Sequence, residues 1–187
     1  MSVAFNVVWK ITDQPLQRDN VYGADGRRVV MGMTALVETI KDNNEDFEFY
    51  PTTREIIRVI ADDLRNKDIR HGKFLDIGAG NGNAFALLKD CNPKIGFDWY
   101  AIEKSLTLIQ LLPDDVYVIG TDFHQQTLID KKVDVIFCNP PYSEYETWTR
   151  KILHEANSPY IYLVIPSRWK EGTHFQMVQD ILEKRNA

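Results

Sequence analysis

Short apolar runs alternate with segments of helical spacing from about residue 49 to the end of this chain. We expect the apolar runs to form strands at residues 74–77, 99–102, 116–119, 133–138 and 160–165. We expect helices at residues 83–90, 105–112, 144–157 and 173–185, with one more that ends near Asn66. Strands that alternate with helices build βαβ units and hence a parallel sheet. The expected fold class is therefore α/β, with a mainly parallel sheet and helices on both faces.

The helix that ends near Asn66 has a recognisable start. Thr52 and Glu55 have the spacing of a capping box, in which two side chains bond the free N–H groups of the first turn. Ile60 and Leu64 then recur at a helical interval. We therefore expect an amphipathic helix that is capped by Thr52.

The 187 residues suggest one domain with a short extra segment. Residues 1–47 form that segment, with a strand expected at residues 4–11, a turn at Asp25-Gly26 and a helix at residues 29–41. We assign it no role. Residues 48–187 hold the alternating pattern and form the main domain.

Composition excludes several classes of protein. No apolar run approaches the ~18 residues of a membrane span, and the first ten residues do not resemble a secretory signal. Cys91 and Cys138 are too few for a disulfide framework or a four-cysteine zinc site, and none of the four histidines has metal-ligand spacing. A reduced, cytoplasmic setting is expected. The net charge of -5 means that any nucleic-acid partner must be recognised at a local site.

Ligands of open parallel sheets bind beyond the carboxyl ends of the strands. The first expected strand runs into Asp76-Ile77-Gly78-Ala79-Gly80-Asn81-Gly82. The glycines leave room for a ligand to touch the backbone, and the next helix offers free N–H groups. Taken alone, this motif fits a tight turn equally well, and its spacing departs from the dinucleotide-binding fingerprint.

Acidic residues follow the next two strands. Glu103, about 20 residues past the glycines, could accept hydrogen bonds from ribose hydroxyls, or it could cap the next helix. Asp122 could accept from the amine of an adenine while Phe123 packs on its ring. A loop carboxylate beside a core phenylalanine is the alternative.

The most specific signal is Asn139-Pro140-Pro141-Tyr142, directly after the fourth expected strand. Two prolines fix the backbone and remove two donors, so the peptide is rigid and its carbonyls can accept hydrogen bonds. Asn139 adds a side-chain carbonyl and Tyr142 a flat ring.

Taken together, these segments resemble the class I methyltransferases that use S-adenosylmethionine, over about residues 49–170. Within that class the match is to N6-adenine DNA methyltransferases of bacteria and their phages. Phe49-Tyr50-Pro51-Thr52 resembles the segment that packs on the methionine end of the cofactor, and residues 164–169 resemble the strand and loop after the catalytic helix. The resemblance implies a Rossmann-like methyltransferase fold, S-adenosylmethionine as cofactor and DNA as partner.

The resemblance also implies roles for individual residues. Asn139, Pro140, Pro141 and Tyr142 would be catalytic: the Asn139 side chain and the Pro140 carbonyl would accept the amine N–H groups, and Tyr142 would stack on the base. The cofactor-binding residues would be Tyr50, Pro51, Thr52, Asp76, Gly78, Ala79, Gly80, Asn81, Glu103, Asp122, Phe123 and Asn139.

The carboxyl end departs from the family's pattern. There, the sheet ends with an antiparallel hairpin beyond the fifth strand, whereas the last element expected here is a helix near Ala187. There is also little room for a target-recognition region. We therefore expect the hairpin to be absent or truncated.

Other substrates and roles stay open. The same tetrapeptide could serve an amine of an RNA base or a glutamine amide of a protein, and a cofactor-binding module without catalysis is a further alternative. Arg150, Lys151, Arg168 and Lys170 could meet phosphates, but a solvated face is favoured for them. Trp148 and Trp169 are expected to be packing residues, and Cys138 a small buried one.

Overall fold

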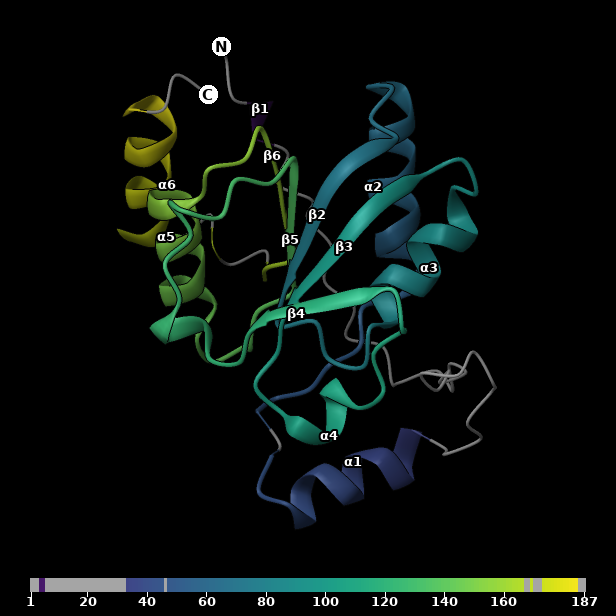
Figure 1. The fold of residues 1–187 in the computed structure, drawn as a ribbon. Helices are drawn as coiled ribbons and strands as arrows, with labels where there is room; N and C mark the ends of the chain where they lie inside the picture. The colour runs from purple at the N-terminus through teal and green to yellow at the C-terminus, as the bar shows by residue number, and fades with distance from the viewer. Residues whose placement is uncertain (1–3, 6–32, 46, 167–168, 170–172, 185–187) are drawn as a thin grey trace.

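A parallel sheet forms the centre of the molecule. The structure, a computed structural model, describes residues 4–5, 33–45, 47–166, 169 and 173–184 (Figure 1). The strands are β1 (Ala4–Phe5), β2 (His71–Ile77), β3 (Gly96–Ile102), β4 (Val116–Gly120), β5 (Val135–Cys138) and β6 (Tyr160–Leu163). They lie in the order β1-β6-β5-β2-β3-β4, and every pairing is parallel. The predicted α/β class with a parallel sheet is confirmed.

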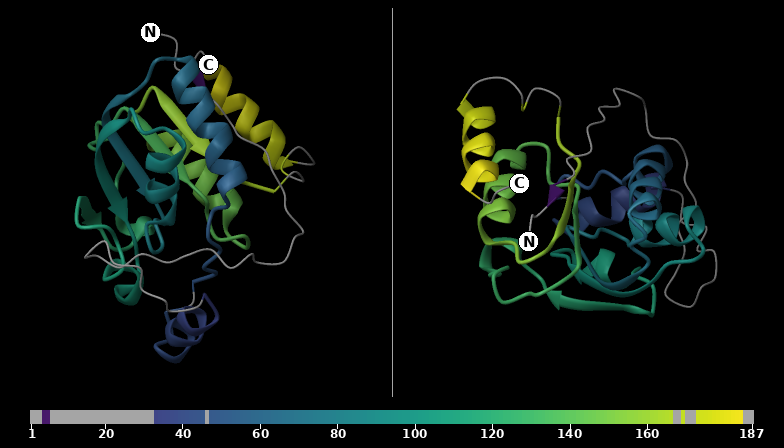
Figure 2. Two further views of the ribbon diagram at one scale, coloured as in Figure 1. Left: turned by 90° about the vertical axis from the view of Figure 1, so that its right-hand side faces the viewer. Right: turned by 90° about the horizontal axis from the view of Figure 1, so that it is seen from above.

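Helices cover both faces of this sheet (Figures 1 and 2). The helices are α1 (Met33–Asp42), α2 (Arg54–Asn66), α3 (Asn83–Cys91), α4 (Leu106–Ile109), α5 (Tyr145–Glu155) and α6 (Thr173–Lys184). Helices α2 and α3 share one core with the sheet, and α5 and α6 share the other.

The two cores follow from the alternation of side chains along each strand. In β2, Phe74 belongs to the core under α2 and α3, whereas Leu75 and Ile77 belong to the core under α5 and α6. All three side chains are buried. A strand covered on both faces is continuously apolar, which explains why these runs predict strands so well.

The predicted capping box is wrong. The N-cap of α2 is Thr53, which makes no side-chain capping hydrogen bond. The Thr52 hydroxyl instead accepts a hydrogen bond from the side chain of Asn139, 3.4 Å away. The helix does end at Asn66, as its apolar spacing predicts.

The helix predicted at residues 105–112 is shorter. Helix α4 ends at Ile109 because the chain then tightens: the N–H groups of Leu111 and Leu112 bond carbonyls three residues back, at Leu108 and Ile109. Pro113 follows this turn.

At the amino end, β1 lies parallel to β6, on the sheet edge beyond the fifth predicted strand. The rest of the strand predicted at residues 4–11, the turn at Asp25-Gly26 and residues 29–32 of the predicted helix lie outside the described residues. Helix α1 places Leu36 and Ile40 against Leu108. In the described part of the chain no strand follows β6, so no C-terminal hairpin is seen there. The domain boundary near residue 47 stays a prediction.

Candidate cofactor and active site

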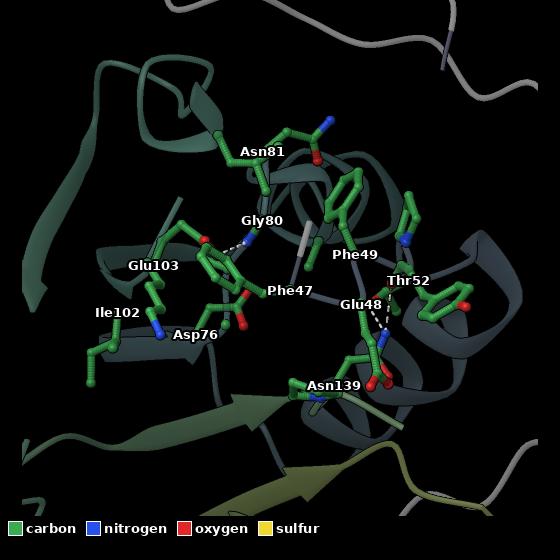
Figure 3. Close-up of a pocket in the computed structure, with 18 of the residues that line it drawn as sticks. Phe47, Glu48, Phe49, Thr52, Asp76, Gly80, Asn81, Ile102, Glu103 and Asn139 are labelled. Atoms are coloured by element: carbon green, nitrogen blue, oxygen red, sulfur yellow. Dashed lines mark hydrogen bonds between the residues drawn. The ribbon is translucent and has the colours of Figure 1, made fainter. Parts of the chain in front are cut away.

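A pocket of about 820 Å³, its open mouth included, lies at the carboxyl ends of β2, β3 and β5. This is where an open parallel sheet binds its ligands. Figure 3 shows its lining, to which the glycine loop, the loop after β5 and the segment before α2 all contribute. The predicted residues that line it are Tyr50, Pro51, Thr52, Asp76, Gly78, Ala79, Gly80, Asn81, Glu103, Phe123, Asn139 and Pro141.

The glycine loop turns sharply out of β2. Gly78 and Gly80 have φ values of +78° and +57°, which residues with a side chain seldom adopt. A Cβ atom on Gly80 would lie 2.6 Å from the ring of Phe49. The loop therefore needs glycine both for its backbone conformation and for the close approach of Phe49.

Asp76 lines the pocket and is only 1 % exposed to solvent. Burial raises the pKa of its carboxyl group well above the ordinary range, and the nearby charge of Glu103 raises it further. Its Oδ1 atom has no hydrogen-bond partner. A buried acceptor without a partner is rare, and a donor or cation supplied by a ligand would satisfy it.

Glu103 is the second buried carboxylate. One oxygen accepts the N–H group of Gly80 at 2.7 Å (Figure 3), and the other accepts that of Ser105 at 2.8 Å. Burial raises its pKa, and these hydrogen bonds oppose the rise. Glu103 thus lines the pocket and also caps the turn that leads into α4, which unites the two interpretations of its sequence position.

Phe123 and Asp122, which follow β4, differ in their position relative to the pocket. Phe123 lines the pocket with its ring 4.4 Å from that of Trp148, centroid to centroid. The Asp122 carboxylate instead accepts from the backbone of His124 at 3.0 Å and the side chain of Gln125 at 3.2 Å. Asp122 does not line the pocket, and its role with the cofactor stays a prediction.

The tetrapeptide predicted to be catalytic, residues 139–142, lies partly in the pocket and partly outside it. Asn139 and Pro141 line the pocket, Pro140 is buried beside it, and Tyr142 is 52 % exposed. The Asn139 amide nitrogen donates to the Tyr50 carbonyl at 3.0 Å and to the Thr52 hydroxyl at 3.4 Å. These two bonds use both amide N–H groups, so the Oδ1 atom of Asn139 is left as an acceptor.

Sequence reasoning missed several lining residues. Phe47, Glu48 and Lys104 line the pocket, and the ammonium group of Lys104 lies 4.6 Å from the centre of the Phe47 ring. The alternation of aromatic and polar residues just before Tyr50 is the signal that could have marked this segment.

Trp148 packs in the core, as predicted, but also lines the pocket. Its indole N–H donates to the Glu144 carboxylate at 2.9 Å, which also bonds His124 at 2.8 Å. Cys138 is fully buried, and burial raises the pKa of its thiol well above the usual range. A neutral thiol of this kind is inert, as the sequence predicts.

The residues present fit S-adenosylmethionine. Asp76 offers an unsatisfied acceptor to an amino group, Glu103 faces the same pocket with a second carboxylate, and aromatic rings provide apolar walls. The glycine loop lets the ligand approach the backbone. The fold and the pocket together are those of a methyltransferase domain that binds S-adenosylmethionine.

Comparison with known proteins agrees with this class. Residues 56–158 match the methyltransferase small domain family, and because this is more than half of the chain, the protein belongs to that family. No curated protein matches the chain. None of the described helices is both long and apolar enough to cross a membrane.

One of the solved structures that the chain resembles has a TM-score above 0.5 and shares its fold. A candidate class I S-adenosylmethionine-dependent methyltransferase from Listeria monocytogenes superposes with a TM-score of 0.60 at 16% identity, over 81% of this chain and 57% of that one. A candidate RNA methyltransferase from Pyrococcus horikoshii gives 0.48 at 18% identity, over 65% and 64%. A third, from Methanococcus maripaludis, gives 0.48 at 19%, over 81% and 71%. The chain thus spans less than two thirds of the first two.

Proposed function

We propose that this methyltransferase modifies an exocyclic amine on a planar group, and that the amine is N6 of adenine in DNA. The observation that carries the proposal is the orientation of the Asn139 side chain. Because its N–H groups bond Tyr50 and Thr52, Asn139 offers the substrate an acceptor and no donor. A substrate that supplies N–H groups fits such a site, whereas a substrate whose reacting group is an oxygen without a hydrogen does not.

Methylation of an adenine amine requires that its lone pair be made available on nitrogen. An adenine amine is a poor nucleophile because its lone pair is delocalised into the ring. The Asn139 side-chain oxygen and the Pro140 carbonyl can each accept one amine N–H, which draws the lone pair back onto nitrogen. They also stabilise the positive charge that develops there. When bound, S-adenosylmethionine supplies an electrophilic methyl group, and the amine later releases a proton to water.

Tyr142 supports a base as the substrate. Its ring is half exposed, directly after the two prolines that fix the loop. Stacking on such a ring contributes about 1–3 kcal/mol per base. This would offset part of the few kcal/mol needed to flip a base out of a duplex.

A second candidate is the glutamine amide of a protein. Two carboxylates lie beside the catalytic loop. Glu48 accepts from Ser143, the residue after Tyr142, and Glu144 accepts from Trp148 in the helix that follows. Negative charge beside the acceptor disfavours a phosphate backbone and favours a protein substrate. An amine of an RNA base would use the same acceptors as adenine in DNA.

Transfer of labelled methyl groups to unmethylated DNA tests the proposal, with the product digested and identified as a nucleoside. We expect N6-methyl-2′-deoxyadenosine from the wild type and a rate about 10²–10³-fold lower for Asn139→Ala. Asn157→Ala is the matched control, because Asn157 bonds the Ile129 carbonyl away from the pocket.

Other results would redirect the assignment. Label in RNA or protein would identify the acceptor as one of the alternatives. Binding of S-adenosylhomocysteine without transfer to any of the three would show a module that binds the cofactor and does not catalyse.

A further inference from the structure

The segment 47–52, called here the cover segment, lies against the glycine loop. The Phe49 ring occupies the space that a side chain on Gly80 would need. The ammonium group of Lys104 lies over the Phe47 ring, 4.6 Å from its centre. The Asn83 side chain donates to the Thr52 carbonyl at 3.1 Å, which ties the end of the segment to the start of α3. The cover segment is therefore one wall of the cofactor pocket.

The same segment holds the catalytic loop, residues 139–143, at both ends. At the start of the loop, the Tyr50 carbonyl accepts from the Asn139 amide. At the end, the Glu48 carboxylate accepts the backbone N–H of Ser143 at 3.0 Å and also its hydroxyl group. Ninety-five positions separate Glu48 from Ser143 in the sequence, so only the tertiary structure brings them together.

Glu48 adopts an unusual backbone conformation to make this contact. Its φ of +58° lies in the left-handed region, which a glutamate seldom occupies. Such a conformation persists only where the surrounding contacts hold it, and it is found most often at functional sites. Two charge-assisted hydrogen bonds from one carboxylate are contacts of that strength.

We propose that Glu48 is a positioning residue for the catalytic loop, an inference that rests on the function proposed above. The Asn139 and Pro140 acceptors can draw out an amine lone pair only if their separation is held constant. Pro140 and Pro141 stiffen the middle of the loop, and the two ties to the cover segment fix its ends. The cover segment also walls the cofactor pocket, but both hydrogen bonds of the Glu48 carboxylate go to Ser143 of the catalytic loop.

Hydrogen–deuterium exchange tests this without any substrate. We expect Glu48→Ala to speed exchange at residues 142–144 by about tenfold or more, because the Ser143 N–H loses its acceptor. Exchange in β2 should not change. Asp130→Ala is the matched control: its carboxylate accepts the Thr127 hydroxyl at 3.0 Å in a loop outside the pocket. Unchanged exchange at residues 142–144 in Glu48→Ala would overturn the proposal.

Kinetics give the second readout. We expect Glu48→Ala to lower kcat by about 10- to 100-fold while the affinity for S-adenosylhomocysteine changes by less than about threefold. The effects of Glu48→Ala and Ser143→Ala should not be additive, because Ser143→Ala removes the hydroxyl bond, one of the two bonds that Glu48→Ala removes. An equal loss of cofactor affinity and rate would make Glu48 a cofactor ligand and overturn the positioning role.

The two proposals can fail separately. If the wild type transfers no methyl group to any amine, the proposed function fails. The exchange experiment on Glu48→Ala would still report whether the tie to Ser143 holds the loop.

Discussion

The charged forms of Asp76 and Glu103 are unfavourable in the folded protein because both carboxyl groups are buried in the pocket. Both are acids whose pKa is raised, chiefly by burial. Between the ordinary pKa and the raised one, the folded protein binds a proton that the unfolded chain does not. The stability that these groups contribute is therefore complete below about pH 4, the ordinary range, and is lost as the pH rises through the raised values.

Asp76→Asn should remove much of this pH dependence. The wild type should lose free energy of unfolding between pH 5 and pH 8, and the variant should lose less, because the amide stays neutral. Urea unfolding at both pH values measures the difference. Asp130→Asn is the control, since the Asp130 pKa is lowered and its effect lies at acid pH. Equal slopes for the wild type and Asp76→Asn would contradict the prediction.

Gly80 is expected to be essential for both the fold and the ligand. Gly80→Ala places a side chain in a left-handed conformation, at a cost of about 1–3 kcal/mol, and pushes it against Phe49. We expect cofactor affinity, measured by calorimetry, to fall at least about tenfold, because relief of the strain moves the loop that lines the pocket. Gly96→Ala, whose neighbour is the His71 ring at 3.1 Å, should bind as the wild type does.

At the scale of elements, two helix starts that look alike in the sequence differ in their capping. Ser105 accepts the N–H of Leu108 at 3.1 Å and donates to Glu45 at 2.6 Å. Thr53 makes no capping bond, and its hydroxyl oxygen is buried without a partner. The residue type at an N-cap therefore does not reveal whether the cap is formed.

Alanine substitutions should separate the two caps. Ser105→Ala should lower the free energy of unfolding by about 0.5–2 kcal/mol, the usual cost of a lost cap, and Thr53→Ala should lower it by far less. Chemical denaturation of both variants measures this. Equal costs would show that the Thr53 hydroxyl does form a bond in solution.

Over the whole molecule, ligand binding should stabilise the fold. The pocket is built by segments from β2, β3, β5 and the chain before α2, so unfolding destroys it. At 100 times its dissociation constant, a ligand adds about 2.7 kcal/mol. S-adenosylhomocysteine should therefore raise Tm by about 5–10 °C in a chain of this length. The same ligand should raise the Tm of Glu103→Ala far less. An equal rise in that variant would show that Glu103 does not contribute to ligand binding.

The sequence alone predicted the order and type of the main elements and the parallel sheet, and its motifs resemble those of methyltransferases, the kind of domain whose family model the chain matches. These depend on local patterns: apolar runs of strand length, helical spacing between them, and glycines, acids and the Asn139–Tyr142 peptide directly after strands. Strand ends meet at one edge of a parallel sheet, so local placement also predicted most of the residues that gather there, with Asp122 as an exception.

Only the tertiary structure decided how the segment before α2 is used. Thr52 faces Asn139 and does not cap the helix, Glu48 reaches Ser143, and Trp148 serves both the core and the pocket. Each contact joins positions brought together by packing of helices on opposite faces of the sheet. Periodicity and turn residues describe a chain over a few neighbours, so they carry no information on contacts of this range.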